Sequence, residues 1–197
     1  MKIAIIKYNA GNVQSVLFAL KRLNVEPVLT DEPEIIQEAD KVIFPGVGEA
    51  SSTMKYLKER ELDTLICQLK QPVLGICLGM QLLCEYSQEG DTKCLGVFPQ
   101  NVLRFIPPKG EKYKIPQIGW NNLYNTRGKL FENTGENPFM YFVHSYYVET
   151  GQYTAAMADY IIPFSAALQK DNFYATQFHP EKSSRVGERL LKNFISI

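Results

Sequence analysis

The chain has 197 residues, of which 45% are hydrophobic and 21% are charged, as in an ordinary globular protein. Basic and acidic residues number 21 each, and this balance disfavours binding to nucleic acid or to an anionic membrane by charge. No apolar run approaches the roughly 18 to 20 residues of a membrane span, and the run at residues 3–6 is too short for the core of a signal peptide. We therefore expect a cytosolic protein with a single domain over residues 1–197.

The four cysteines, Cys67, Cys77, Cys84 and Cys94, lack the C-x-x-C spacing that is typical of structural zinc sites. In the cytosol, reduced and packed thiols are the expected state of such residues. We therefore expect no disulfide, no metal site and no cofactor.

The N-terminal part predicts a strand followed by a helix. Residues 3–6 form an apolar run of strand length, and Asn12 is the predicted N-cap of the helix that follows. The apolar positions of this helix recur at helical spacing: Val13, Val16, Leu17 and Leu20.

Two further strands and a long helix precede the centre of the chain. Residues 25–29 and 41–44 predict strands, and the second is stopped by the Pro-Gly-Val-Gly loop at residues 45–48. The glycines of this loop would allow close approach of a ligand, although a plain βα turn is the alternative. Residues 51–69 predict one helix with a buried stripe of Met54, Leu57, Leu62, Leu65, Ile66 and Leu69.

The stretch at residues 71–85 carries the most specific local motif. Residues 73–76 predict a buried strand that turns at Cys77 into a helix, which is the pattern of a nucleophile elbow. Such a turn strains its central residue, and Gly75 and Gly79 avoid clashes with the neighbouring strand and helix. A cysteine at a helix N-terminus is favoured as the thiolate. Taken alone, the pattern also fits a buried cysteine in a crossover.

The alternation of strands and helices predicts an α/β fold, with a mostly parallel sheet and helices on both faces. Ligands bind such sheets at the carboxyl ends of the strands, where the 45–48 loop and Cys77 both lie. Shorter strand candidates predict an antiparallel extension of the sheet: residues 102–106, 123–124, 140–148 and 166–168. A final strand at residues 174–178 precedes a closing helix whose apolar face is Val186, Leu190, Leu191, Phe194 and Ile195.

A cysteine nucleophile needs a base, and the chain contains two histidines, His144 and His179. His179 follows the last predicted strand, and Glu181 comes two residues later to hold the imidazole in one tautomer. His144, inside an aromatic run, is more typical of a half-buried histidine with satisfied hydrogen bonds. The residues therefore favour a triad of Cys77, His179 and Glu181, with a surface turn as the alternative for the His-Pro-Glu segment.

Acyl transfer also needs N–H donors for the oxyanion of the tetrahedral intermediate. The backbone N–H of Leu78, directly after the nucleophile, is one candidate, and an amide from Val47 or Gly48 is the other. The glycines of the loop would let a peptide rotate towards the site.

Three motifs in this order resemble those of the class I, or triad, glutamine amidotransferases: Pro-Gly-Val-Gly at 45–48, Gly-Ile-Cys-Leu-Gly-Met-Gln at 75–81 and His-Pro-Glu at 179–181. The match spans the whole chain. The resemblance implies that Cys77 attacks the side-chain amide of glutamine and forms a γ-glutamyl thioester. It also implies that His179 passes the proton to ammonia, that Glu181 orients His179 and that water releases glutamate.

The same resemblance assigns substrate and partner contacts. Gln81 and Glu89 match positions that bind the glutamine, and backbone groups of Ser145 and Tyr146 match the segment that holds its carboxylate. The resemblance is strongest to glutaminase subunits that form a heterodimer with a (β/α)8-barrel cyclase subunit, which receives the ammonia through an internal channel. The positions that match the docking face are Asn12, Trp120 and Lys182.

Two positions depart from the family pattern. The first turn contains Lys7-Tyr8-Asn9 where the family usually has Asp-Tyr-Gly, and Gln117 stands where a histidine often precedes Gly-Trp-Asn. A paralogue that supplies ammonia to another synthase, for example in surface-sugar amidation, is therefore an alternative. The others are a stand-alone cysteine hydrolase and a non-catalytic binding protein, and the complete triad disfavours the second.

Overall fold

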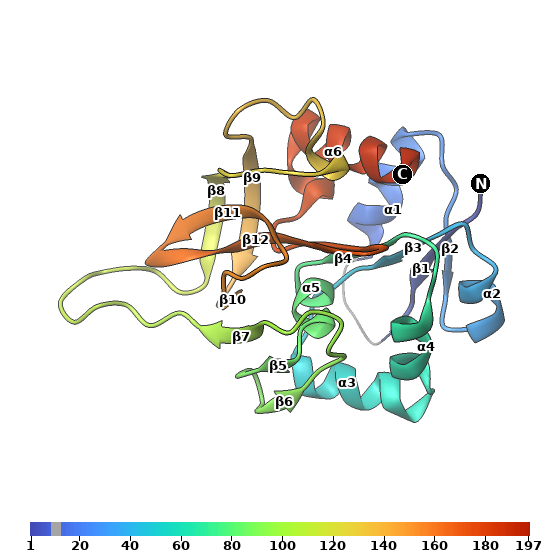
Figure 1. Cartoon of the computed structure of the whole chain (residues 1–197), viewed down its shortest axis with the longest axis horizontal. Coiled ribbons are helices and arrows are strands. Elements are labelled where there is room, and N and C mark those ends of the chain that lie inside the picture. The colour runs from blue at the N-terminus through green and yellow to red at the C-terminus, as the bar shows by residue number, and fades with distance from the viewer. Residues whose placement is uncertain (9–12) are drawn as a thin grey trace.

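The computed structural model describes residues 1–8 and 13–197, and a large mixed sheet forms its centre (Figure 1). One half of this sheet is parallel. Its first four strands in the chain are separated by helices, which allow parallel crossover connections, and its fifth strand comes from the C-terminal part of the chain. In sheet order, these strands are β2 (Val28–Thr30), β1 (Ile3–Ile6), β3 (Lys41–Phe44), β4 (Val73–Ile76) and β13 (Phe173–Thr176).

The other half is mainly antiparallel and continues the sheet beyond β13. Its strands follow in the order β12 (Ile162–Lys170), β10 (Tyr146–Val148), β7 (Asn101–Arg104), β5 (Tyr86–Ser87) and β6 (Thr92–Lys93). The strand β11 (Thr154–Tyr160) pairs with β12 outside this order. A separate antiparallel pair is formed by β8 (Gln117–Asn122) and β9 (Phe139–His144).

Helices cover both faces of the parallel half (Figure 1). On one face lie α1 (Gln14–Arg22) and α6 (Ser184–Ser196). On the other lie α2 (Pro33–Gln37), α3 (Ala50–Glu59), α4 (Leu62–Gln68) and α5 (Leu78–Leu83). Two short 3-10 helices complete the described elements, η1 (Lys129–Phe131) and η2 (Pro180–Lys182). The predicted fold class is thus confirmed: an α/β sheet with a parallel centre, helices on both faces and an antiparallel extension.

Side chains of the central strands alternate between two hydrophobic cores. Ile3 and Ile5 of β1 pack in the core under α1 and α6, whereas Ala4 and Ile6 pack in the core of α3 and α4. The strands β3 and β4 divide in the same way, with Ile43, Leu74 and Ile76 in the first core and Val42, Phe44 and Val73 in the second. Because both faces are covered, these strands are continuously apolar in sequence, which is why they could be predicted within a residue.

The predicted helix at residues 51–69 and the predicted strand at 25–29 need correction. Two helices replace the single helix, because Glu61 adopts a left-handed φ of 55° between α3 and α4. The predicted apolar stripe is nevertheless buried in one core. The strand β2 begins only at Val28, since the N–H of Val25 bonds back to the Leu20 carbonyl and Pro27 has no N–H to give.

The antiparallel half follows the sequence prediction less closely. The predicted strand at residues 140–148 is interrupted at Ser145, and its two parts, β9 and β10, belong to different sheets. The predicted strand at 123–124 is wrong, because β8 ends at Asn122 and Tyr124 makes an isolated bridge to Met157. The sequence does not predict β5, β6, β8, β11 or α2. Of these, β5, β6 and α2 are short, β8 contains glycine and two asparagines, and β11 is rich in alanine.

The start of α1 differs from the prediction as well. Asn12, the predicted N-cap, lies outside the described residues, and the N-cap position of α1 is Val13, which makes no side-chain capping bond. Across the helices that the structure describes, none has the length and apolar character needed to cross a membrane.

Candidate active site

Cys77 stands at a sharp turn between β4 and α5. Its φ of 53° lies in the left-handed region that an L-residue avoids, as predicted for the centre of an elbow. Added Cβ atoms would meet Leu83 Cδ1 at 2.7 Å at Gly75 and the Phe44 carbonyl at Gly79. Only glycine therefore lets strand and helix approach closely enough to hold Cys77 in this conformation.

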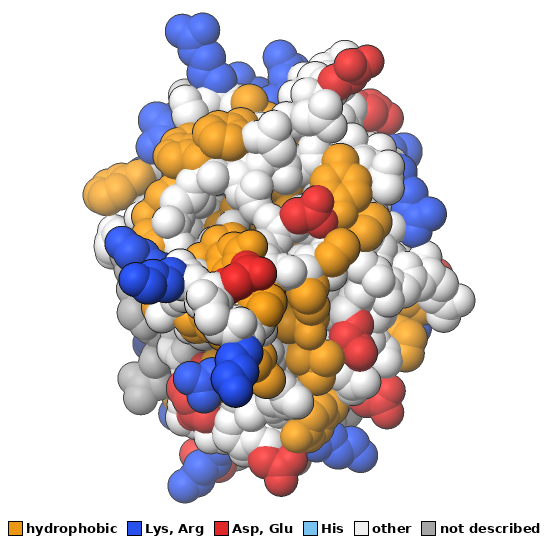
Figure 2. All heavy atoms as spheres, turned by 90° about the vertical axis from the view of Figure 1, so that its left-hand side faces the viewer, with side chains coloured by type: hydrophobic (Ala, Val, Ile, Leu, Met, Phe, Trp, Pro, Cys, Tyr) orange, Lys and Arg blue, Asp and Glu red, His pale blue; other side chains and the backbone are white. Residues whose placement is uncertain are grey.

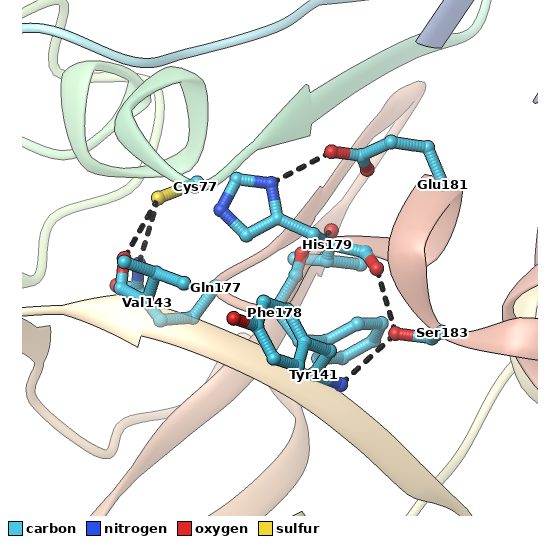
Figure 3. A network of polar contacts seen from close by, with 9 residues as sticks. Cys77, Tyr141, Val143, Gln177, Phe178, His179, Glu181 and Ser183 are labelled. Atoms are coloured by element: carbon cyan, nitrogen blue, oxygen red, sulfur yellow. Dashed lines mark hydrogen bonds and ion pairs between the residues drawn. The ribbon is translucent and has the colours of Figure 1, made fainter. Parts of the chain in front are cut away.

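His179 and Glu181 reach the same place from the end of β13 and from η2. The His179 ring lies beside Cys77, and its Nδ1 is 2.7 Å from Glu181 Oε1 (Figure 3). The exposed fraction of the two side chains is 5% and 4%, so this contact is shielded from water. The structure therefore brings together the three residues of the predicted triad.

The segment that carries His179 is held against β9. The His179 N–H donates to the Tyr141 carbonyl at 2.9 Å. The buried Ser183 hydroxyl donates to the His179 carbonyl at 2.6 Å and accepts from the Tyr141 N–H at 3.0 Å (Figure 3). These bonds fix the backbone on both sides of the imidazole.

Opposing influences set the charge of His179. Burial acts most strongly and disfavours the protonated ring, whereas the charge of Cys77, a hydrogen bond with its sulphur and the Glu181 carboxylate favour it. The net effect raises the pKa of His179 above that of a free imidazole. An imidazolium beside a thiolate is the ion pair that activates a cysteine nucleophile.

A cleft of about 330 Å³ opens in front of Cys77. It is lined by the predicted oxyanion and substrate residues together with the triad base: Val47, Gly48, Leu78, Gln81, Glu89, Ser145, Tyr146 and His179. Lys182, a predicted partner contact, also lines it. Trp120 lies away from the cleft on β8 and is 45% exposed, and Asn12 is outside the described residues.

The 45–48 loop follows the end of β3, and its residues Gly46, Val47 and Gly48 line the cleft. The buried Tyr8 hydroxyl donates to the Pro45 carbonyl and so anchors the start of the loop. Burial, and then the negative charge of Cys77, raise the pKa of the Tyr8 phenol, so it remains a donor. Gly48 at the other end has a φ of 141°, a conformation that side chains rarely adopt.

Glu89 and Gln81 already have bonds within the protein. Glu89 Oε2 accepts from the Ala50 N–H at 2.9 Å, and burial is the main cause that raises the pKa of Glu89. Gln81 Nε2 lies 3.2 Å from the Tyr146 carbonyl and 3.0 Å from Gln177 Oε1. These contacts hold both side chains in place at the wall of the cleft.

His144 is packed and hydrogen-bonded at both ring nitrogens. Its Nδ1 lies 2.7 Å from the Tyr146 carbonyl and its Nε2 lies 2.9 Å from Gln117 Oε1. A neutral ring with the proton on Nδ1 satisfies both contacts when the Gln117 amide is turned over, so that its nitrogen takes the place of Oε1 and donates to Nε2. Burial is the main cause that lowers the pKa of His144 to about 4. His144 is thus the satisfied histidine that the sequence predicts, although more deeply buried.

Sequence reasoning missed two groups that touch the nucleophile. Gln177 Nε2 and the Val143 carbonyl each lie 3.7 Å from Cys77 Sγ (Figure 3). A backbone carbonyl leaves no signal in the sequence. Gln177 leaves a weak one, because it is a polar residue at the end of an apolar strand, two positions before the candidate base.

Metal ligands do not gather in the part of the chain that the structure describes: no group of three or more His, Cys, Asp or Glu side chains could hold an ion. The four cysteines are free thiols, with Cys67 exposed and the other three buried.

Comparison with known proteins places this geometry in a family. The model of the family "Glutamine amidotransferase class-I" matches residues 5–197. The chain is 60% identical over 197 residues to the imidazole glycerol phosphate synthase subunit HisH of Bacteroides thetaiotaomicron, and the match covers 100% of both chains. It is 42% identical over 203 residues to the protein of the same name from Vibrio parahaemolyticus, covering 100% of this chain and 98% of that one.

Solved structures share the fold at lower identity. A crystal structure of a glutamine amidotransferase has a TM-score of 0.74 at 19% identity, over 98% of this chain and 97% of that chain. A glutamine amidotransferase from Thermotoga maritima has a TM-score of 0.66 at 19% identity, over 100% and 83% of the two chains. The sequence matches over the whole chain and the shared fold lead to one conclusion: the chain belongs to the class I glutamine amidotransferases, among the imidazole glycerol phosphate synthase HisH subunits.

Proposed function

We propose that Cys77, His179 and Glu181 are the catalytic triad of a glutaminase that hydrolyses glutamine to glutamate and ammonia. The observation that carries the proposal is the position of His179, which lies beside Cys77 while its Nδ1 is 2.7 Å from Glu181 Oε1. In this place the imidazole can exchange protons with the nucleophile and its leaving group, and the carboxylate keeps its orientation.

The reaction runs in two halves. The Cys77 thiolate attacks the side-chain carbonyl carbon of glutamine, and the C–N bond breaks as the His179 imidazolium gives its proton to the leaving nitrogen. Ammonia leaves, and a γ-glutamyl thioester remains on Cys77. His179 then takes a proton from water, the hydroxide adds to the thioester, and the C–S bond breaks to release glutamate and restore the thiolate.

Backbone donors at the mouth of the cleft stabilise the tetrahedral intermediates. The N–H of Leu78 and an N–H from Val47 or Gly48 are the proposed pair, and these three residues line the cleft. Each such donor contributes about 10² to 10³ in rate. The hydrogen bond from Tyr8 fixes the loop at Pro45. The peptides around Val47 and Gly48 are therefore the part of the loop that can rotate towards the site.

The remaining cleft residues hold the amino-acid end of glutamine. Glu89 is placed to attract the α-ammonium group, and backbone groups of Ser145 and Tyr146 to bind the α-carboxylate. The Gln81 nitrogen donates to the Tyr146 carbonyl and to Gln177, so the contact of Gln81 with the substrate runs through Oε1.

A (β/α)8-barrel cyclase subunit is the proposed partner and receives the ammonia. With it, the cyclase converts a phosphoribulosyl-formimino aminoimidazole carboxamide ribonucleotide to imidazole glycerol phosphate, for histidine synthesis, and an aminoimidazole carboxamide ribonucleotide. The relatives are named as subunits of imidazole glycerol phosphate synthase, which supports an assembly with a second chain.

The proposed docking face contains the β8–β9 pair. Figure 2 shows the side of the molecule at the left of Figure 1, where hydrophobic side chains are exposed between scattered charged ones. The β8–β9 pair exposes Ile118, Trp120 and Phe139, and the Trp120 and Phe139 rings stack with centroids 5.7 Å apart. The pair is also connected to the triad, because the Tyr141 carbonyl of β9 accepts from the His179 N–H. A partner bound here would therefore be coupled to the base.

Glutaminase assays test this proposal and its rivals. Turnover is measured for the chain alone, with the cyclase, and with the cyclase plus its nucleotide, and a peptide panel is assayed in parallel. We expect slow turnover alone and strong activation by the loaded cyclase, because ammonia released without an acceptor would be lost. Full turnover by the chain alone, unchanged by the cyclase, would favour a stand-alone hydrolase, and activation by a different synthase would favour a paralogue.

A further inference from the structure

Gln177 is a fully buried polar residue at the nucleophile that the mechanism above does not use. It lies between β13 and His179, and its N–H donates to the Ala166 carbonyl at 2.8 Å, which fixes its backbone. Its side-chain amide reaches the sulphur of Cys77, with Nε2 at 3.7 Å from Sγ (Figure 3). A buried side-chain amide needs hydrogen-bond partners for both its nitrogen and its oxygen.

The orientation of the Gln177 amide is set by the Tyr146 carbonyl, which acts through the side chain of Gln81. The Tyr146 carbonyl can only accept, and Gln81 Nε2 lies 3.2 Å from it, so Gln81 turns its N–H groups towards Tyr146. The same nitrogen lies 3.0 Å from Gln177, and it needs an acceptor there, which is Oε1. The Gln177 nitrogen is therefore left facing Cys77, where it is a donor.

The two polar neighbours of the sulphur favour different states of Cys77. The Val143 carbonyl, 3.7 Å from Sγ, can accept from a neutral thiol but repels a thiolate. The Gln177 N–H has the opposite preference, because hydrogen bonds to charged groups are stronger than neutral ones. Deprotonation of the thiol thus exchanges the Val143 contact for the Gln177 contact.

We propose that Gln177 is a further catalytic residue, whose side-chain N–H donates to the Cys77 thiolate and stabilises its charge before attack and after the thioester breaks. The inference rests on the proposed function, since it takes Cys77 as the nucleophile. Gln81 and the Tyr146 carbonyl act behind Gln177, because they set which end of its amide faces the sulphur.

The pH dependence of alkylation tests this role without any glutaminase assay. The rate at which iodoacetamide modifies Cys77 is measured by peptide mass spectrometry from pH 5 to 10, in a Cys67→Ser background because Cys67 is exposed. Gln177→Met removes the donor at similar length, and Gln177→Asn keeps an amide but withdraws it from the sulphur. We expect both to move the midpoint of the rate profile up by about one pH unit, the size of one charge-assisted hydrogen bond.

Gln100→Met is the matched control. Gln100 is a buried glutamine outside the cleft whose side-chain atoms have no hydrogen-bond partner among the described residues. Its midpoint should equal that of the parent. Among the described residues, the other titratable groups that face Cys77 or line its cleft are Tyr8, Glu89, His144, Tyr146, His179 and Lys182, and every variant retains them.

A second readout is catalysis by the complex with the cyclase. The Gln177 variants should lose about tenfold in kcat with little change in KM, since the bond is made to the nucleophile and not to glutamine. Folded Gln177 variants with the midpoint of the parent would overturn the inference. A parent protein whose Cys77 shows no titrating reactivity would instead overturn the proposed function.

Discussion

His179 Nδ1 lies 2.7 Å from Glu181 Oε1, and Pro180 alone separates the two residues in the chain. The base and its orienting acid therefore belong to one turn, whose geometry is fixed locally by proline and by η2. The other carboxylate oxygen, Glu181 Oε2, is buried and has no hydrogen-bond partner among the described residues. One oxygen of the carboxylate thus makes the bond on which the orientation of the imidazole depends.

Substitutions of His179 and Glu181 should show how far catalysis depends on the imidazole and on its orientation. His179→Ala in the complex with the cyclase should lower glutaminase kcat by about 10² to 10⁴, because proton transfer is lost. Glu181→Gln keeps an acceptor for Nδ1 but removes the charge, so its loss should be smaller. Steady-state kinetics and circular dichroism are measured together. Equal kcat in His179→Ala and the parent would leave the triad without its base.

The nucleophile can be tested by covalent labelling. Cys77→Ser and Cys77→Ala should abolish glutamine hydrolysis while leaving cyclase binding nearly unchanged, because the side chains are similar in size. An electrophilic glutamine analogue should label Cys77 in the parent protein. Cys67→Ser is the control and should retain activity, since this thiol is exposed and outside the cleft. Preferential labelling of Cys67, Cys84 or Cys94 would contradict the elbow assignment.

Acid should destabilise the protein through His144. Burial first, and the charge of His179 after it, lower the pKa of His144 to about 4 against the opposing bond to the Tyr146 carbonyl. Between about pH 4 and 6.5 the unfolded chain binds a proton that the folded chain refuses, so stability falls as the pH falls through this window. At pH 5 this costs about 2 kcal/mol relative to pH 8.

His144→Asn supplies the comparison, because its amide can still donate to the Tyr146 carbonyl. Urea unfolding at pH 5 and pH 8 should show that the parent loses about 2 kcal/mol more than the variant over this interval. The contribution of His179, whose raised pKa stabilises the folded state most below pH 6.5, is common to both proteins and cancels. Parallel pH profiles of the two proteins would show that His144 does not titrate as proposed.

The break between α3 and α4 predicts how substitutions there change the free energy of unfolding. Glu61 holds a left-handed φ of 55°, which costs an L-residue about 1 to 2 kcal/mol. Glu61→Gly removes this strain, partly offset by the greater flexibility of glycine, and should stabilise the fold by up to about 1 kcal/mol. Lys55→Gly within α3 should instead cost about 1 kcal/mol. Thermal unfolding of both variants checks the opposite signs.

The docking face predicts a selective loss of partner binding. Trp120 is 45% exposed and stacks on Phe139, so its removal should leave the fold intact. Trp120→Ala should weaken the cyclase complex by about 2 kcal/mol or more, as expected of an aromatic anchor at an interface. Titration calorimetry measures this change. Ile162→Ala, at another exposed apolar position on β12, serves as the comparison and should bind more tightly than Trp120→Ala.

Three central strands of the sheet and the elements of the triad can be predicted from the amino-acid sequence alone. The strands β1, β3 and β4 are buried on both faces, so each has a continuous run of buried residues that predicts a strand without knowledge of the neighbouring strands. The roles of Cys77 and Glu181 can be predicted for a similar reason, since a nucleophile elbow and a His-Pro-Glu turn are patterns of neighbouring residues. Local physical rules suffice for such features.

The packing of the folded chain, in contrast, determines which groups that are distant in sequence come into contact. The antiparallel strands depend on partners far along the chain, and their side chains carry weak periodicity, so β9 and β10 could not be assigned to different sheets from their sequence. The neighbours of Cys77 are of the same kind: Val143 comes from β9 and Gln177 from the end of β13, 66 and 100 residues away. Contacts over such separations form because the packed sheet brings strand ends together, and no local pattern records them.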